Sequence, residues 1–352
     1  MKASPDEATL GDRLARLIAT SGPISVARYM AEANSCYYAA RDPLGQAGDF
    51  VTAPEISQMF GELIGLCLAD LWTRAGVPAD VHYVELGPGR GTLAADALRA
   101  MRAAGLRPPI HFVETSPVLR GAQARQVPAA TWHDDLATVP EHAPLLIIAN
   151  EFFDTLPVHQ LIATGKGWHE RLVGHRDRRF VALPGPPASA AAIPDHLRAS
   201  PPGTIIETSP AAVAVIRQLA QLIGRSGGAL LLIDYGHART APGETLQAVS
   251  HHEYTDPWIN PGAHDLTAHV DFESLAAAAE RAGLRPFGPR GQGEWLETMG
   301  IGLRAAALSK AAPTHAEEIA AARHRLTHPQ EMGTLFKVMA LVAPGWPEPA
   351  GF

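Results

Sequence analysis

The 352-residue sequence is poor in cysteine and has no long apolar run. Its two cysteines, Cys36 and Cys67, form no CxxC pair, so neither a zinc site nor a disulfide framework is predicted, and we expect no bound metal. No apolar run approaches the ~18 residues that a membrane span requires. The first residues show no secretory signal. These absences predict a soluble protein from a reducing compartment, the bacterial cytoplasm.

Charge is also scarce. Charged residues make up 18% of the chain, and the net charge is −7 with no basic block, so a nucleic-acid backbone is not an expected partner. Apolar residues make up 46%, which is typical of a globular protein and excludes disorder for the chain as a whole. A cationic side chain remains an acceptable substrate.

From residue 81 onward, strand-like and helix-like segments alternate. The predicted strands cover residues 81–86, 110–113, 145–149 and 229–233. Residues 145–149 are all apolar, as in a strand that is buried on both faces of a parallel sheet. The alternation predicts an α/β fold with a mostly parallel sheet.

Other segments are predicted around this core. We expect a helix over 10–20, a loop over 34–54, a long core helix that starts at a Thr52–Glu55 capping box, a helix over 314–326 and a last strand over 335–342. We expect an N-terminal helical region with a cofactor-covering loop over 1–80 and a core over 81–183 and 204–236. An exposed insertion rich in proline and alanine is expected over 184–203, and substrate-covering loops or a small subdomain over 237–300. A closing helix and strand are expected over 301–352.

A glycine-rich turn between a strand and a helix is the first candidate site. Gly87, Gly89 and Gly91 form a GxGxG pattern, whereas a dinucleotide fold favours GxGxxG. Glu85 precedes the turn and would repel a pyrophosphate, but it suits the ammonium group of S-adenosylmethionine (SAM). We therefore favour SAM over NAD, with a simple tight turn as the alternative.

Acidic residues after the next two predicted strands extend this site. Glu114 follows the strand 110–113 and is predicted to accept hydrogen bonds from the ribose hydroxyls of a nucleoside. Asp134 or Asp135 is predicted to accept from the adenine amino group. The alternative for Glu114 is a surface carboxylate that precedes a helix cap. The alternative for Asp134 and Asp135 is a polar loop with no ligand.

The strand 145–149 ends in a group of polar residues. Asn150, Glu151 and Asp154 should lie beyond the carboxyl end of the sheet, where open α/β sheets bind ligands. Paired carboxylates could orient a guanidinium, which is always protonated, and aim one nitrogen at the transferred methyl group. The alternative is a helix cap formed by Asn150 with dipole-favoured acids.

Further polar segments are assigned to the neighbourhood of this site. Thr52 and Pro54 belong to a loop that is predicted to cover the cofactor, and the sequence 234–236 ends another strand. Whether Glu55, Asp265, His269 or Asp271 touches the substrate stays open at this point.

The motifs together resemble those of the MidA-like class I SAM-dependent methyltransferases, whose mitochondrial members are complex I assembly arginine methyltransferases. The matching blocks span nearly the whole chain: GPISVARYM (22–30), GDFVTAPEISQMFGELIG (48–65), VELGPGRGTLAADAL (84–98), HFVETSPVLR (111–120), IIANEFFDTLPVHQ (147–160), LLIDYG (231–236), DLTAHVDF (265–272) and MGTLFKVMAL (332–341). One departure is the stretch 33–38, which lacks the His-Pro-containing sequence that many relatives carry.

The resemblance implies a Rossmann-like, seven-stranded, mostly parallel sheet with one reversed strand. It also implies methyl transfer from SAM, leaving S-adenosylhomocysteine, to an arginine of a protein such as a respiratory complex I subunit. A SAM-binding assembly chaperone and a small-molecule methyltransferase are the alternatives.

Overall fold

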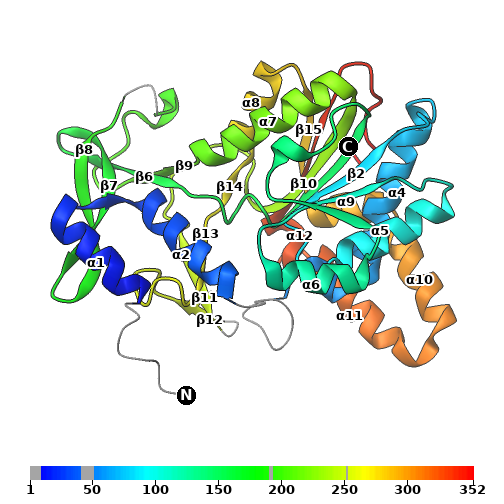
Figure 1. The fold of residues 1–352 in the computed structure, drawn as a ribbon, viewed down its shortest axis with the longest axis horizontal. Coiled ribbons are helices and arrows are strands. Elements are labelled where there is room, and N and C mark those ends of the chain that lie inside the picture. The colour runs from blue at the N-terminus through cyan, green and yellow to red at the C-terminus, as the bar shows by residue number, and fades with distance from the viewer. Residues whose placement is uncertain (1–8, 41–50, 190–192, 251–252) are drawn as a thin grey trace.

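The computed structural model describes residues 9–40, 51–189, 193–250 and 253–352. Figure 1 shows a core of strands and flanking helices at the right, beside an antiparallel sheet that carries α1 (Leu10–Ser21) at the left. Capping by Thr9 begins α1, and Gly22 ends it with a positive φ of 83°.

The core sheet has seven strands in the order β15-β16-β10-β5-β2-β3-β4. Their bounds are β2 His82–Leu86, β3 Ile110–Val113, β4 Ala130–His133, β5 Leu145–Asn150, β10 Gly228–His237, β15 Arg285–Gly291 and β16 Phe336–Val342. Only β16 is reversed, because it runs antiparallel to both of its neighbours. A short strand, β14 (Val270–Asp271), pairs with the end of β10. The prediction of a mostly parallel sheet with one reversed strand is confirmed.

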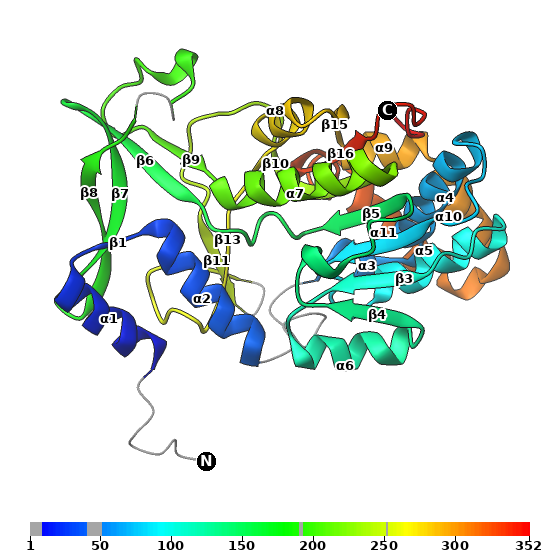
Figure 2. The same cartoon turned by 45° about the horizontal axis from the view of Figure 1, so that its top comes forward.

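Helices cover both faces of the core sheet (Figure 2). Alternate residues of the central strands pack with the two different layers. Leu146 and Ile148 of β5 pack with α4 and α5, whereas Leu145 and Ile147 pack with α7 and α8. The helix bounds are α4 Gln58–Arg74, α5 Thr92–Ala103, α6 Pro117–Gln126, α7 Pro210–Ser226, α8 Phe272–Arg281, α9 Gln292–Thr298, α10 Ile301–Ala311, α11 Ala316–Thr327 and α12 Met332–Leu335. Both faces of β5 are therefore buried, as its apolar run predicts.

Two smaller sheets lie outside the core. One has the order β1-β7-β6-β9, with β8 on β7, and the other has the order β12-β11-β13. The bounds are β1 Ile24–Ser25, β6 His159–Thr164, β7 Gly167–Arg176, β8 Arg179–Pro187, β9 Ile205–Thr208, β11 Gln247–Ser250, β12 Glu253–Thr255 and β13 Asp265–Thr267. Helix α2 (Val26–Ala40) packs against both sheets through a shared apolar cluster.

Several sequence predictions are wrong. Residues 34–40 belong to α2 and are not a loop, and the segment 41–50 lies outside the described residues. The long core helix does not begin at a Thr52–Glu55 capping box, because α3 (Ala53–Ile56) ends first and Ser57 caps α4 by accepting from the Met59 N–H. Thr52 makes no side-chain capping bond.

The expected division of the chain also needs correction. Strands β6, β7 and most of β8 lie within 81–183, yet they belong to the separate sheet and not to the core. Conversely, α8, β15 and α9 lie within 237–300, where we expected covering loops, and they complete the core. The segment 184–203 is not wholly exposed, since Ile193 and Leu197 are buried.

A glycine permits the closest approach between two core helices. A Cβ built on Gly65 of α4 would lie 2.3 Å from the carbonyl oxygen of Ala97 in α5. The space that a side chain would need is occupied by backbone, which cannot rotate away. The glycine therefore lets α4 pack directly on the helix that follows the glycine turn.

We predict that Gly65→Ala destabilises the protein, although alanine is the better helix former, because overpacking costs about 1–3 kcal/mol. Gly121→Ala in α6 is the matched control, since a Cβ there meets nothing within 4 Å. The control should gain roughly 0.5–1 kcal/mol from its helix propensity. Urea unfolding of both variants measures the difference, and equal stabilities would refute the packing argument.

Candidate active site

The glycine turn links β2 to α5 with three residues of positive φ: 58° at Gly87, 55° at Gly89 and 85° at Gly91. A Cβ at Gly87 would lie 3.1 Å from the Phe152 ring, so this position has little room for a side chain. The turn brings backbone close to a cavity and presents the N-terminus of α5, a favourable place for polar ligand groups.

The cavity has a volume of about 740 Å³ and lies at the carboxyl ends of the core strands. Its lining includes many of the predicted residues: Thr52, Pro54, Glu55, Glu85, Gly87, Gly89, Glu114, Asn150, Glu151, Asp154, Asp265 and His269. Gly91 is not among the lining residues and is the N-cap of α5. Six carboxylates therefore line one cavity together with one arginine, Arg90, among the described residues.

Glu85 lies beneath the glycine turn and is 3% exposed. Its carboxylate accepts a hydrogen bond of 2.5 Å from the Tyr83 hydroxyl. Burial raises the pKa of Glu85 to about 8, and the bond from Tyr83 partly offsets this rise. A cation placed beside Glu85 would favour its ionised form.

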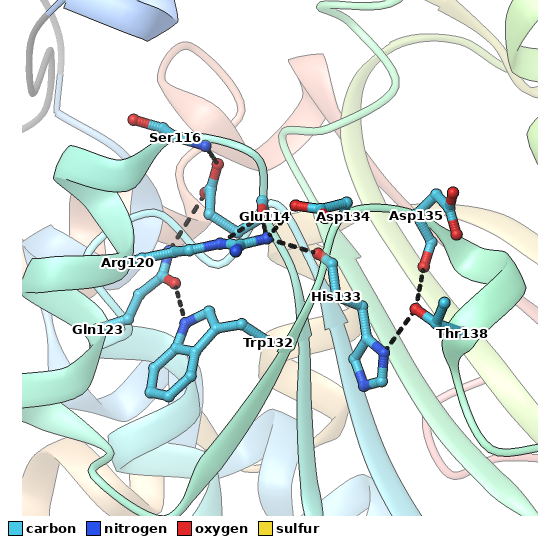
Figure 3. A network of polar contacts seen from close by, with 9 residues as sticks. All are labelled: Glu114, Ser116, Arg120, Gln123, Trp132, His133, Asp134, Asp135 and Thr138. Carbon is cyan, nitrogen blue, oxygen red and sulfur yellow. Dashed lines mark hydrogen bonds and ion pairs between the residues drawn. The ribbon is translucent and has the colours of Figure 1, made fainter.

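Glu114 is fixed in a network of hydrogen bonds at the end of β3 (Figure 3). One carboxylate oxygen accepts from the Ser116 N–H at 2.7 Å, and the other accepts from the Gln123 amide at 3.2 Å. The same Gln123 amide donates to the carbonyl of Gly89 at 2.8 Å, and Trp132 donates to the Gln123 oxygen at 2.8 Å. Gln123 thus couples the glycine turn to the carboxylate that we predict binds the ribose.

Two predicted residues do not reach the cavity. Asp134 is 85% exposed in its side chain and forms an ion pair with Arg120 at 2.7 Å. Asp135 accepts from the Ala137 N–H and caps a short 3-10 helix. In Figure 3 Asp134 lies beside the end of the Arg120 side chain, and Asp135 lies farther from Glu114, next to Thr138. The structure therefore gives no support to an adenine contact by either aspartate.

The segment after β5 carries the acidic centre of the cavity. Glu151 has a positive φ of 49°, an unusual conformation for a residue other than glycine. Its carboxylate accepts from the Asn150 amide at 3.2 Å and from the Ala53 N–H at 3.3 Å. Burial, followed by the charge of Asp154, raises the pKa of Glu151 to about 8. Burial likewise raises the pKa of Asp154 to about 6.

A fully buried carboxylate holds this segment in place. One oxygen of Asp234, at the end of β10, accepts from the N–H groups of Phe152, Phe153 and Asp154 at 3.0–3.3 Å. Asp234 is 0% exposed, and burial raises its pKa well above the usual range while these N–H groups oppose the rise. The alternative reading, a helix cap by Asn150, does not apply, because no helix lies between β5 and β6 in the described part of the chain.

Two buried side-chain oxygens that face the cavity have no hydrogen-bond partner in the described residues: Asn150 Oδ1 and Asp154 Oδ1. Unpaired polar atoms of this kind are rare in protein interiors. Both atoms can accept hydrogen bonds, so the cavity is short of donors. A bound ligand that carries N–H groups would complete it.

The opposite wall comes from α2, β13 and the carboxyl-terminal part of β10. Tyr38 of α2 donates to Asp265 of β13 at 2.9 Å, and Tyr235 forms side-chain hydrogen bonds with Asp154 and Thr267. His269 lines the cavity beside Tyr235, but Asp271 instead caps α8 through the Ser274 N–H. Glu55 lines the cavity and accepts from the Thr92 hydroxyl at 2.6 Å. Asn34, Tyr38, Gln247, Tyr254 and Thr267 are therefore cavity residues that sequence reasoning missed.

The sheet order, the glycine turn and the acidic cavity together define a Rossmann-like methyltransferase of class I. A family model described as "Putative S-adenosyl-L-methionine-dependent methyltransferase" matches residues 63–290. The chain belongs to this family, is a SAM-dependent methyltransferase, and has SAM as its cofactor. The residues present fit this group, because an acidic cavity beneath a glycine turn suits an ammonium, a sulfonium and a ribose.

Two named relatives and one solved structure are similar over nearly the whole chain. The mitochondrial protein arginine methyltransferase NDUFAF7 of Mus musculus is 37% identical, covering 92% of this chain and 82% of the relative. The Drosophila melanogaster homologue is 36% identical, covering 97% and 86%. A crystal structure from Burkholderia thailandensis, bound to S-adenosyl-homocysteine, has a TM-score of 0.86 and 30% identity over 97% of this chain and 93% of that chain.

The comparisons contradict one prediction. We expected a bacterial cytoplasmic protein, but curated relatives at 36–37% identity are named as mitochondrial proteins. Within the described residues, no helix is both long enough and apolar enough to span a membrane.

We predict that Glu114→Ala weakens S-adenosylhomocysteine binding at least tenfold, because the loss of a charged hydrogen-bond acceptor typically removes about 1.5–3 kcal/mol. Asp134→Ala is the matched control, and it should leave the affinity unchanged. Calorimetric titration of both variants measures the effect. A large loss in Asp134→Ala would restore the sequence-based assignment and contradict the geometry.

We further predict that SAM binds more tightly as the pH rises from 6 to 8. In the free protein Glu85 has a pKa of about 8, so at lower pH it must lose a proton before it can pair with a cation. The affinity should then change by up to about tenfold per pH unit below that pKa and level off above it. Glu85→Gln should bind weakly with a flatter pH profile, and a profile equal to that of the wild type would exclude Glu85 from the effect.

Proposed function

We propose that this protein transfers a methyl group from SAM to an arginine side chain of a partner protein. The observation that carries the proposal is the buried pair Glu151 and Asp154 at the end of β5, with Asp265 on the opposite wall. Three carboxylates in one cavity suit a planar guanidinium, which offers five N–H donors. The names of the mitochondrial relatives agree with this substrate class.

The proposed chemistry assigns a separate task to each group. Bound SAM supplies a methyl group on a positively charged sulfur. Glu151 and Asp154 would accept hydrogen bonds from the guanidinium and hold one nitrogen toward the methyl carbon. As the N–C bond forms and the C–S bond breaks, the electron pair passes to sulfur, and a carboxylate takes the proton that the nitrogen loses. Asn150 would orient Glu151 through the 3.2 Å bond described above.

Within this proposal, a respiratory complex I subunit is the partner that we favour. The support is the motif resemblance together with the names of relatives that match more than 90% of the chain. Glu85 and Glu114 would bind the cofactor, with the glycines of the turn, Thr52 and Pro54 around it.

The direct experiment incubates purified protein with methyl-labelled SAM and a mitochondrial extract depleted of this activity. The proposal predicts label in protein, recovered as methylarginine after acid hydrolysis. Label confined to low-mass compounds would support a small-molecule methyltransferase instead. If no label is transferred while a Glu151→Gln, Asp154→Asn double variant still rescues complex I assembly in a deletion strain, the protein acts as an assembly chaperone.

We predict that Glu151→Gln lowers turnover by roughly 10²- to 10⁴-fold, the usual contribution of a positioned base. Its affinity for SAM should stay unchanged, since Glu85 and Glu114 hold the cofactor. Glu141→Gln is the matched control, because Glu141 is 59% exposed and pairs with Arg225 away from the cavity. An unchanged rate in Glu151→Gln would remove this residue from the mechanism.

A further inference from the structure

Three buried histidines form a continuous hydrogen-bonded row across three neighbouring strands of the core sheet. Nδ1 of His82 in β2 lies 2.8 Å from Nε2 of His111 in β3, and Nδ1 of His111 lies 3.0 Å from Nε2 of His133 in β4. The row ends at the Thr138 hydroxyl, 2.8 Å from Nδ1 of His133. All three residues are buried, with 7–8% of their surface exposed.

The other end of the row opens to the surface beside two further ligand-type side chains. Nε2 of His82 lies 3.3 Å from an Asp80 carboxylate oxygen, and the ring of His142 packs edge-on against His82 at 5.5 Å. One ligand atom from each of Asp80, His82 and His142 lies within 4.8 Å of the other two. Asp80 and His142 are exposed, so both can rotate toward a shared ion.

The spacing agrees with metal coordination. Ligands that surround zinc tetrahedrally at about 2.0–2.1 Å are separated from each other by roughly 3.3–3.4 Å. The 3.3 Å between Nε2 of His82 and the Asp80 carboxylate oxygen matches that separation, and it is long for a charged hydrogen bond of about 2.7–2.9 Å. The other two pairs lie within 4.8 Å, a distance that rotation of the exposed Asp80 and His142 side chains can shorten.

The row also sets the tautomer of His82 that a metal ion requires. If Thr138 accepts from Nδ1–H of His133, each histidine donates through Nδ1 and accepts through Nε2. Nε2 of His82 then carries a lone pair directed at Asp80 and His142. A ligating histidine whose other nitrogen donates to a fixed acceptor is the common arrangement in metal sites.

We propose that Asp80, His82 and His142 bind a divalent transition-metal ion of the zinc class, with His111 and His133 orienting the ligand His82. Two imidazoles and a carboxylate suit zinc and leave one position for water. The sequence predicts no metal because it has no CxxC pair and no other metal-binding spacing motif. His142 lies sixty residues from His82, so no local pattern joins these ligands.

The proposed ion lies far from the cavity in which we place methyl transfer. Asp80 and His82 stand at the start of β2 and His142 precedes β5, whereas the cavity lies at the opposite, carboxyl ends of these strands. The row connects the metal site to β3 and β4, and His133 also accepts from the Glu114 N–H through its carbonyl. The ion would therefore stabilise the part of the sheet that carries Glu85 and Glu114, without entering the reaction.

Calorimetric titration of untagged, chelator-treated protein with Zn²⁺ tests this site, with thermal unfolding as a second measurement. We expect one tight equivalent of Zn²⁺ and a higher melting temperature, with no such effect of Mg²⁺, which prefers oxygen ligands. His142→Ala should abolish both effects and leave SAM binding unchanged. Asp80→Asn repeats the test at a second exposed ligand.

The matched control is His324→Ala. His324 and His328 stack at 4.3 Å, so they form another place where surface zinc could bind. If His324→Ala abolishes tight binding of Zn²⁺ while His142→Ala retains it, the proposed site is wrong. Absence of a tight equivalent in the wild type would equally overturn the proposal and leave the row as a hydrogen-bonded chain that ends on Asp80.

The variant His111→Phe tests the orienting role, and it should weaken zinc binding by roughly 10- to 100-fold. Since His111 is buried, its fold is checked by SAM binding before zinc is added. A folded His111→Phe variant with unchanged zinc affinity would show that the row does not orient His82.

Discussion

Carboxylates buried in one cavity without paired cations are the constraint on which the rest of the site depends. Glu85, Glu151 and Asp154 form no ion pair with lysine or arginine among the described residues, and burial raises the pKa of each. Such groups are unfavourable until a cationic ligand restores their charge. The glycine turn, the bonds to Asp234 and the tyrosine bonds hold these acids in place, so the cavity favours positively charged ligands.

A buried amide helps to fix the covering side of the cavity. Asn34 of α2 donates to the carbonyls of Leu266 and Thr155 at 2.7 and 3.0 Å and accepts from the Leu266 N–H at 3.0 Å. It thereby ties α2 to β13 and to the segment after β5. The two walls of the cavity are thus fixed to each other by segments that lie more than 100 residues apart in the sequence.

The sequence predicted the core well where burial alone decides the pattern. Residues 145–149 and 229–233 are apolar throughout because both faces of these strands are covered. It failed for β15, whose Pro286 and Pro289 indicate a turn, because an edge strand tolerates proline. It also failed for α8, although Phe272, Leu275, Ala278 and Ala279 are buried together and Asp271 caps the helix.

Within the site, position after a strand predicted Glu114, Glu151 and Asp154 as cavity residues, and position before the glycine turn predicted Glu85. The same rule misplaced Asp134, because Arg120 draws its carboxylate away, and spacing along the chain does not reveal that ion pair. Tyr38, Asp265 and Thr267 reach the cavity through packing of α2 and β13, which no local pattern indicates.

Calorimetric titration of the purified protein with SAM, S-adenosylhomocysteine and NAD tests the central claim most directly. The acidic cavity predicts one equivalent of each of the first two ligands and no binding of NAD, whose pyrophosphate would face Glu85. Binding of NAD, or failure of both adenosyl ligands to bind, would contradict the account.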